Sequence, residues 1–194
     1  MSIQQSSEDA QAIEDTRRWV QRAVIGLNLC PFAKAVEVKQ QVRYVVSPAR
    51  KIKAALADLQ RELLALAEAD PGQLDTTLLL LPYGFADFME YVHLLERADG
   101  LLQELELDGV LQIASLHPQY QFDDTEPEDL GNNTNRSPYP TLHLLREASV
   151  SRAIAAFANP EKIFETNIRT MQQLGRAGWE AMGVCASKLP DDAP

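Results

Sequence analysis

The chain has 194 residues, of which 45% are hydrophobic and 24% charged, so it is long enough to bury a core without disulfide staples. Its formal net charge of −10 argues against a nucleic-acid-binding protein, because binding to phosphates needs a basic field. No apolar run approaches the roughly 18 residues of a membrane span, which argues against a membrane protein.

Residues 1–10 form a polar leader without the basic and apolar regions of a signal peptide. Two widely separated cysteines, Cys30 and Cys185, do not make a disulfide framework, which favours a reducing compartment. We therefore expect a cytoplasmic protein with a single domain at residues 11–186 and a disordered tail at 187–194.

The first half of the chain predicts a helix, a strand and a second helix. Apolar residues recur at helical spacing from Ile13 to Leu27, and Pro31 ends that pattern. Residues 41–46 alternate and predict a strand. Ser47-Pro48 predicts the start of the next helix, with the serine as N-cap, and an apolar stripe follows at 52–66.

The next elements are two strands on either side of a helix. Residues 76–81 form a continuous apolar run, which is typical of a strand buried on both faces. Asp87 and Glu90 have the spacing of a capping box, and the apolar positions from 88 to 105 predict the helix behind it. A third strand is expected at 110–116.

A fourth strand is expected at 141–145, followed by a helix from Ser149 and another that is capped by residues 159–161 and runs towards Gly175. Alternating strands and helices are typical of parallel crossovers. We expect an α/β fold with a mixed, largely parallel four-stranded sheet and flanking helices. The direction of the fourth strand stays open, and a ferredoxin-like α+β fold is the alternative.

The segment from His117 to His143 is the most informative part of the chain. A loop of this length inside a compact domain is uncommon and is usually a lid, a binding loop or disorder. We expect residues 117–122 and 135–141 to be pinned to the body, and the crest at 123–133 to be exposed.

Ligands of open α/β sheets bind beyond the carboxyl ends of the strands. If the fourth strand is antiparallel, the long loop leaves and returns at that edge. One cleft would then hold four predicted residues, with His143 just below them: His117, Tyr83, Tyr139 and Arg136.

His117 is the candidate acid or base, because imidazole changes charge near neutral pH, and Cys30 is a less favoured candidate nucleophile. The alternatives are a histidine that only pins the loop and a cysteine that is only a small buried side chain. For His143 we favour a half-buried sheet residue over a binding role.

Arg136 is the candidate clamp for a carboxylate or phosphate, and Tyr83 or Tyr139 would orient the bound molecule. The alternative for Arg136 is an ion pair with an acidic residue of the loop. A metal held by His117 and His143 with Asp123 or Asp124 has suitable ligand types but no compact motif spacing, so we expect none. The sequence specifies neither a cofactor nor an oligomeric state.

Four blocks resemble a bacterial family that is catalogued only as a domain of unknown function, over roughly residues 12–185. The blocks are Thr16-Arg17-Arg18-Trp19-Val20, the stretch Gly26-Leu27-Asn28-Leu29-Cys30-Pro31-Phe32, His117-Pro118-Gln119-Tyr120-Gln121-Phe122 and Asn135-Arg136-Ser137-Pro138-Tyr139-Pro140. The resemblance implies a bacterial cytoplasmic protein and supplies no activity, cofactor or catalytic residue.

Two functions fit the sequence. The first is an enzyme that acts on a small polar or anionic metabolite at a cleft around the 117–143 loop. The second is a non-catalytic module that binds a ligand or a partner protein. An enzyme needs His117 within hydrogen-bond reach of a second polar candidate in a concave pocket, whereas a protein-binding module needs an exposed apolar patch.

Overall fold

The computed structural model describes residues 3–155 and 162–187, and within them four strands form one mixed sheet with the order β1-β2-β4-β3. The strands are β1 (Val42–Val46), β2 (Thr76–Leu80), β3 (Leu111–Leu116) and β4 (Thr141–Arg146). β1 and β2 pair in parallel, whereas β4 is antiparallel to both β2 and β3. The predicted mixed sheet of an α/β fold is confirmed, although only one of its pairings is parallel.

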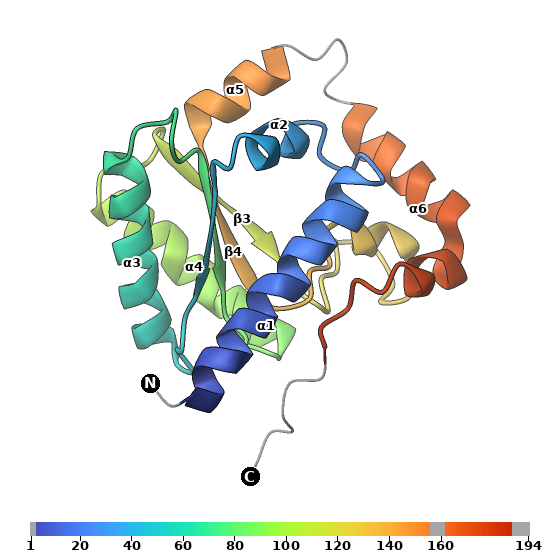
Figure 1. Ribbon diagram of the computed structural model, residues 1–194, viewed down its shortest axis with the longest axis horizontal. Helices are drawn as coiled ribbons and strands as arrows, with labels where there is room; N and C mark the ends of the chain where they lie inside the picture. Colours follow the sequence, from blue (N-terminus) through green and yellow to red (C-terminus); the bar gives the residue numbers. More distant parts are fainter. Residues whose placement is uncertain (1–2, 156–161, 188–194) are drawn as a thin grey trace.

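Helices cover both faces of this sheet (Figure 1). They are α1 (Ile3–Trp19) with its π-helical continuation η1 (Val20–Ile25), α2 (Ala33–Val38), α3 (Ile52–Glu68), α4 (Phe88–Glu104), the 3-10 helix η2 (Leu130–Thr134), α5 (Glu147–Ala155) and α6 (Lys162–Ala181). Apolar side chains of α3 and α4 pack on one face, and those of α1, η1 and α6 pack on the other.

Side-chain alternation along the strands sorts the core into these two layers. Leu79 of β2 and Leu142 of β4 belong to the layer under α3 and α4, while Leu78 and Leu80 belong to the layer under α1 and α6. All five residues of β2 are buried, because β2 is an inner strand with helices on both faces. The expectation of a strand buried on both faces is confirmed.

The predicted helix start at Ser47-Pro48 is wrong, because α3 begins at Ile52. The backbone N–H of Ser47 donates to the carbonyl of Leu80 at 2.9 Å, which prolongs the pairing of β1 with β2 by one residue. The Ser47 hydroxyl donates instead to Asp58 inside α3. Continuation of the sheet therefore outweighs the local capping signal.

Helical structure also reaches further towards the N-terminus than expected, since residues 3–10 of the predicted leader belong to α1. At the other end, α6 contains a non-helical residue at Gly175, whose φ of +68° favours glycine. The helix bends there and sends its last turns back towards α1 (Figure 1). The predicted cap at 159–161 and the tail from 188 onwards lie outside the described residues.

The long loop contains η2 and is tied together by a buried asparagine. Asn132 accepts hydrogen bonds from the backbone of Phe122 at 3.1 Å and the hydroxyl of Thr125 at 3.0 Å, and it donates to the carbonyl of Glu126 at 2.9 Å. Asn132 and Asn133 are buried, so the expectation of a fully exposed crest is wrong at these two positions. The asparagines supply internal bonds that replace regular secondary structure.

Candidate functional site

His117 is buried at the end of β3, with both ring nitrogens engaged by the backbone. Its Nε2 donates to the carbonyl of Phe85 at 2.9 Å, and its Nδ1 accepts from the N–H of Gln119 at 3.0 Å. The ring packs against Phe88 and Tyr91 of α4. Burial lowers the pKa of His117, so the neutral ring is favoured. In this arrangement the ring pins the start of the loop and has no nitrogen left for proton transfer.

His143 lies in the middle of β4, opposite Leu78 on one side and Ala114 on the other. Its Nε2 is 2.8 Å from the hydroxyl oxygen of Thr76, and that hydroxyl also donates to the carbonyl of Leu144 at 2.6 Å. Since a hydroxyl has one hydrogen, Nε2 of His143 is the donor to Thr76. Burial lowers the pKa of His143 to about 4.

The two histidines do not meet. The neighbours of His143 in β4, Leu142 and Leu144, face α3 and α4, so His143 points to the opposite face. His117 packs on the α4 side. Among the described residues, no group of three or more His, Cys, Asp or Glu side chains is placed to hold a metal ion.

The two candidate tyrosines bind acidic residues of α1. The hydroxyl of Tyr139 donates to Oδ2 of Asp15 at 2.7 Å, and that of Tyr83 donates to Oδ1 of Asp9 at 2.8 Å. Burial and these acidic partners raise the pKa of both tyrosines, so neither is a base near neutral pH. Tyr139 is fully buried, so it can stabilise the surroundings of the site but does not contact a ligand at the surface.

Asp15 is a buried acid that the sequence analysis did not single out. Besides Tyr139, its carboxylate accepts the backbone N–H and the hydroxyl of Ser187, both at 2.8 Å, and it forms an ion pair with Arg18. A signal existed: Asp15 is three residues after Ala12 and four before Trp19, which places it on the buried face of α1.

The C-terminal segment 182–187 is attached to α1 mainly through polar contacts. Arg22 donates to the carbonyl of Met182 at 2.9 Å, and Arg18 donates to that of Gly183 at 3.1 Å. Ser187 completes the attachment through Asp15. Val184 between them is buried in the apolar layer under α1.

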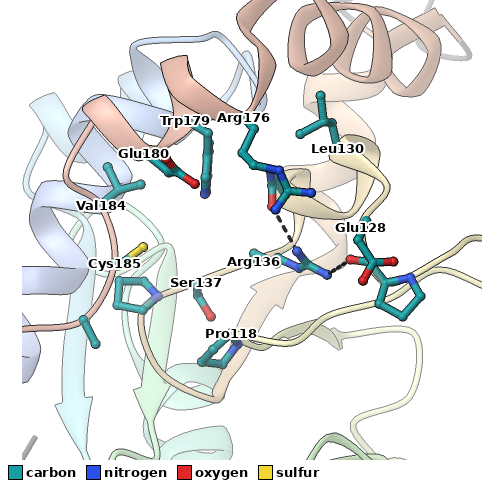
Figure 2. Close-up of a pocket in the computed structure, with 14 residues that line it drawn as sticks. Pro118, Glu128, Leu130, Arg136, Ser137, Arg176, Trp179, Glu180, Val184 and Cys185 are labelled. Atoms are coloured by element: carbon teal, nitrogen blue, oxygen red, sulfur yellow. Dashed lines mark hydrogen bonds between the residues drawn. The ribbon is translucent and has the colours of Figure 1, made fainter. Parts of the chain in front are cut away.

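A pocket of about 540 Å³ lies between this segment, the end of α6 and the long loop (Figure 2). Its polar or charged lining is Glu128, Asn133, Arg136, Ser137, Arg176, Glu180 and Cys185. Its apolar lining is Pro118, Pro127, Leu130, Pro138, Trp179, Val184 and Ala186. Of the six candidate site residues, only Arg136 lines this pocket. The lining of this pocket therefore differs from that of the predicted cleft, in which Arg136 was grouped with His117, Tyr83 and Tyr139.

Arg136 holds the loop closed through oxygen acceptors and not through an acidic partner. It donates to the carbonyls of Tyr120 at 3.1 Å and Pro127 at 2.7 Å and to Oδ1 of Asn133 at 3.4 Å. An arginine has five N–H groups, so two remain without an acceptor among the described residues. The pKa of Arg136 is lowered by burial and by the nearby charge of Arg176.

Arg176 extends from α6 into the same pocket and is exposed (Figure 2). Within the described ranges 3–155 and 162–187, neither Arg136 nor Arg176 forms an ion pair. Two like charges thus face one pocket without a direct counter-ion. No local sequence pattern marks Arg176 and Trp179 as site residues, because the contact between α6 and the loop joins distant parts of the chain.

The cysteines occupy different surroundings. Cys30 is half-buried between η1 and α2 and does not line the pocket, whereas Cys185 is exposed and lines it. Neither cysteine is in a disulfide. In the part of the chain that the structure describes, no helix combines the length and apolar character required to cross a membrane.

Among known proteins, the chain matches the model of one described family. Neither a curated protein nor a solved structure matches the chain. The family model covers residues 11–181, which include residues 11–19 of α1, the four strands, the long loop and the arginine-bearing part of α6. The chain belongs to the family described as a protein of unknown function (DUF1415).

Proposed function

We propose that this protein binds a small anionic metabolite in the pocket between the long loop and the end of α6, and that it does so in the cytoplasm. The observation that carries the proposal is the pair Arg136 and Arg176, two guanidinium groups that share one pocket without an ion-pair partner in the described residues. Guanidinium groups bind carboxylates and phosphates through charge-assisted, often paired, hydrogen bonds.

Three further features support an anion as the ligand. Burial and then repulsion from Arg176 lower the pKa of Arg136, and an anion between the two arginines relieves that repulsion. Asn133 and Ser137 add polar groups at the pocket wall. The pocket volume of about 540 Å³ lies within the range of about 300–1,000 Å³ that is typical of small-molecule sites.

Trp179 offers a direct test, because it lines the pocket while the chain's other tryptophan, Trp19, is buried in the core. A Trp19→Phe protein leaves Trp179 as the single fluorescent reporter. We expect its emission to change saturably when anionic metabolites are added, and uncharged analogues to have no effect.

The matched variants for this titration are Arg176→Gln and Arg169→Gln. Both arginines are exposed on α6, but only Arg176 lines the pocket. Losing a charge-assisted hydrogen bond should weaken binding about tenfold or more in Arg176→Gln. Arg169→Gln should bind as the parent does. Equal loss in both variants would mean that positive charge anywhere on α6, and not this pocket, attracts the anion.

Catalysis on the bound metabolite is the second candidate function, and the exposed thiol of Cys185 in the pocket wall supports it. A thiol is a nucleophile when it is deprotonated beside an oriented substrate. Turnover of a ligand found in the titration should then stop in Cys185→Ser and continue in Cys30→Ser. If Cys185→Ser binds the ligand and loses no reaction relative to the parent, Cys185 is not a catalytic nucleophile and the protein is a binding protein.

A further inference from the structure

The charges around Arg136 point to the kind of anion that the pocket takes. Arg136 and Arg176 supply two positive charges, and Glu128 is close enough for its charge to raise the pKa of Arg136. The three side chains together carry one net positive charge. A carboxylate supplies the single negative charge that balances it, while a phosphate monoester carries up to two.

The hydrogen-bonding capacity of Arg136 also favours a carboxylate. After its bonds to Tyr120, Pro127 and Asn133, two of its N–H groups remain. A carboxylate has two oxygens and accepts paired bonds from a guanidinium. Figure 2 shows the side chains of Arg136 and Arg176 in the same part of the pocket, so we expect one bound group to contact both.

Trp179 lines the same pocket as the two arginines and provides a flat apolar surface there (Figure 2). Leu130, Pro138 and Val184 contribute further apolar lining. A flat ring attached to the carboxylate buries apolar area here and contacts the indole, and aromatic pairs add about 0.5–1.5 kcal/mol beyond the area that they bury. The pocket therefore favours an anion that bears a ring over a simple anion.

The opposite side of the pocket has the other sign of charge. Glu180 lies beside Trp179 and Val184, away from Glu128 (Figure 2), and it forms no ion pair among the described residues. A second anionic group at the far end of the ligand would meet this carboxylate and be repelled.

From these observations we infer that the ligand is an aromatic carboxylate whose negative charge is confined to one end. The inference rests on the anion binding proposed above and adds to it the ring, the single carboxylate and the uncharged or cationic far end. Arg136 and Arg176 bind the carboxylate, Trp179 contacts the ring, and Glu180 excludes a second acidic group.

Four probes separate these features by calorimetric titration: benzoate, acetate, terephthalate and phenyl phosphate. We expect benzoate to bind about tenfold more tightly than acetate, because acetate lacks the ring. Terephthalate should bind more weakly than benzoate, and phenyl phosphate should bind no more tightly than benzoate. Two variants provide controls: Trp179→Leu should remove the preference for benzoate over acetate, and Glu180→Gln should restore terephthalate binding.

The outcomes distinguish this inference from the proposed function. If acetate and benzoate bind equally, or phenyl phosphate binds best, the aromatic carboxylate is overturned while anion binding stands. If terephthalate equals benzoate, the far end accepts a second acid and the inference also fails. If none of the probes binds, both the inference and the anion-binding proposal are overturned.

Discussion

The hydroxyl of Tyr139 donates a 2.7 Å hydrogen bond to the carboxylate of Asp15, although the two residues are 124 positions apart in the chain. Ser187 donates to the same carboxylate twice. One buried acid thus joins α1, the end of the long loop and the C-terminal segment that forms one wall of the pocket. Burial alone would raise the pKa of Asp15, but the hydrogen bonds from Tyr139, Ser187 and Gln11 outweigh burial and lower it.

Replacing Asp15 by Asn should therefore destabilise the fold. The amide has one acceptor oxygen where the carboxylate has two, and its NH₂ group faces existing donors. We expect a loss of about 3 kcal/mol in the free energy of unfolding, measured with urea near pH 7. The control is Glu14→Gln, an exposed neighbour on α1 that should change stability by less than about 0.5 kcal/mol. If the two variants are equally stable, Asp15 is not a structural junction.

Stability should fall as the pH is lowered from 7 to 5, because two histidines have lowered pKa values. Burial lowers the pKa of both His117 and His143, in the latter case from an ordinary 6.5 to about 4. The unfolded chain therefore takes up protons first. The contribution of the two neutral rings to the free energy of unfolding is complete above about pH 6.5. Below that pH it is lost, by at most about 1.4 kcal/mol per pH unit for each histidine.

The measurement is a series of urea denaturation curves across this range. Asp15 does not interfere, because its contribution is lost only at pH values below its ordinary pKa of 3.8. His143→Gln should flatten the pH dependence, whereas His93→Gln, at an exposed position of α4, should leave it unchanged. A wild-type stability that is constant between pH 7 and 5 would contradict the buried neutral state of both rings.

Arg136→Ala should loosen the long loop, because the Arg136 side chain donates hydrogen bonds to the carbonyls of Tyr120 and Pro127 and so joins separate parts of the loop. Amide hydrogen exchange should accelerate across residues 120–128 while the strands keep their protection. Global stability should fall by about 1–2 kcal/mol, the range for a few partly exposed hydrogen bonds. Unchanged exchange in the loop would show that Asn132 alone holds it.

The strands were predictable from the sequence, and the site largely was not. The apolar runs at 76–81 and 110–116 are bounded by turn residues, so their positions follow from local pattern. The helix start at Ser47 was misassigned because its backbone pairs with Leu80, a contact that no local pattern records. A local sequence pattern mispredicts the secondary structure where a contact with a distant residue determines it.

Contacts between distant parts of the chain also explain why the candidate site was only partly predicted. The sequence pointed to the loop and to Arg136, which lines the pocket. It grouped His117 and His143 because strand ends suggested a shared edge, but the alternation in β4 turns His143 to the other face. Arg176 and Trp179 follow a bend at Gly175, and no local pattern in the sequence records that the chain after this bend meets the long loop.

Cys185 should react with a thiol reagent faster than Cys30, because its side chain is exposed and that of Cys30 is half-buried. In a Cys30→Ser protein, a saturating pocket ligand should slow alkylation of Cys185, which lines the pocket. Mass spectrometry over a time course measures both rates. Alkylation of Cys185 that is unaffected by ligand would place the binding site elsewhere.

The proposed function depends on Arg136 and Arg176 binding one anion together. Nuclear magnetic resonance of the arginine side-chain Nε–H groups tests it most directly, with benzoate as the titrant and Arg169 as the reference on α6. The signals of Arg136 and Arg176 should shift together along one saturation curve, while that of Arg169 should stay unchanged. Signals of Arg136 and Arg176 that remain unchanged, or that shift no more than Arg169, would contradict it.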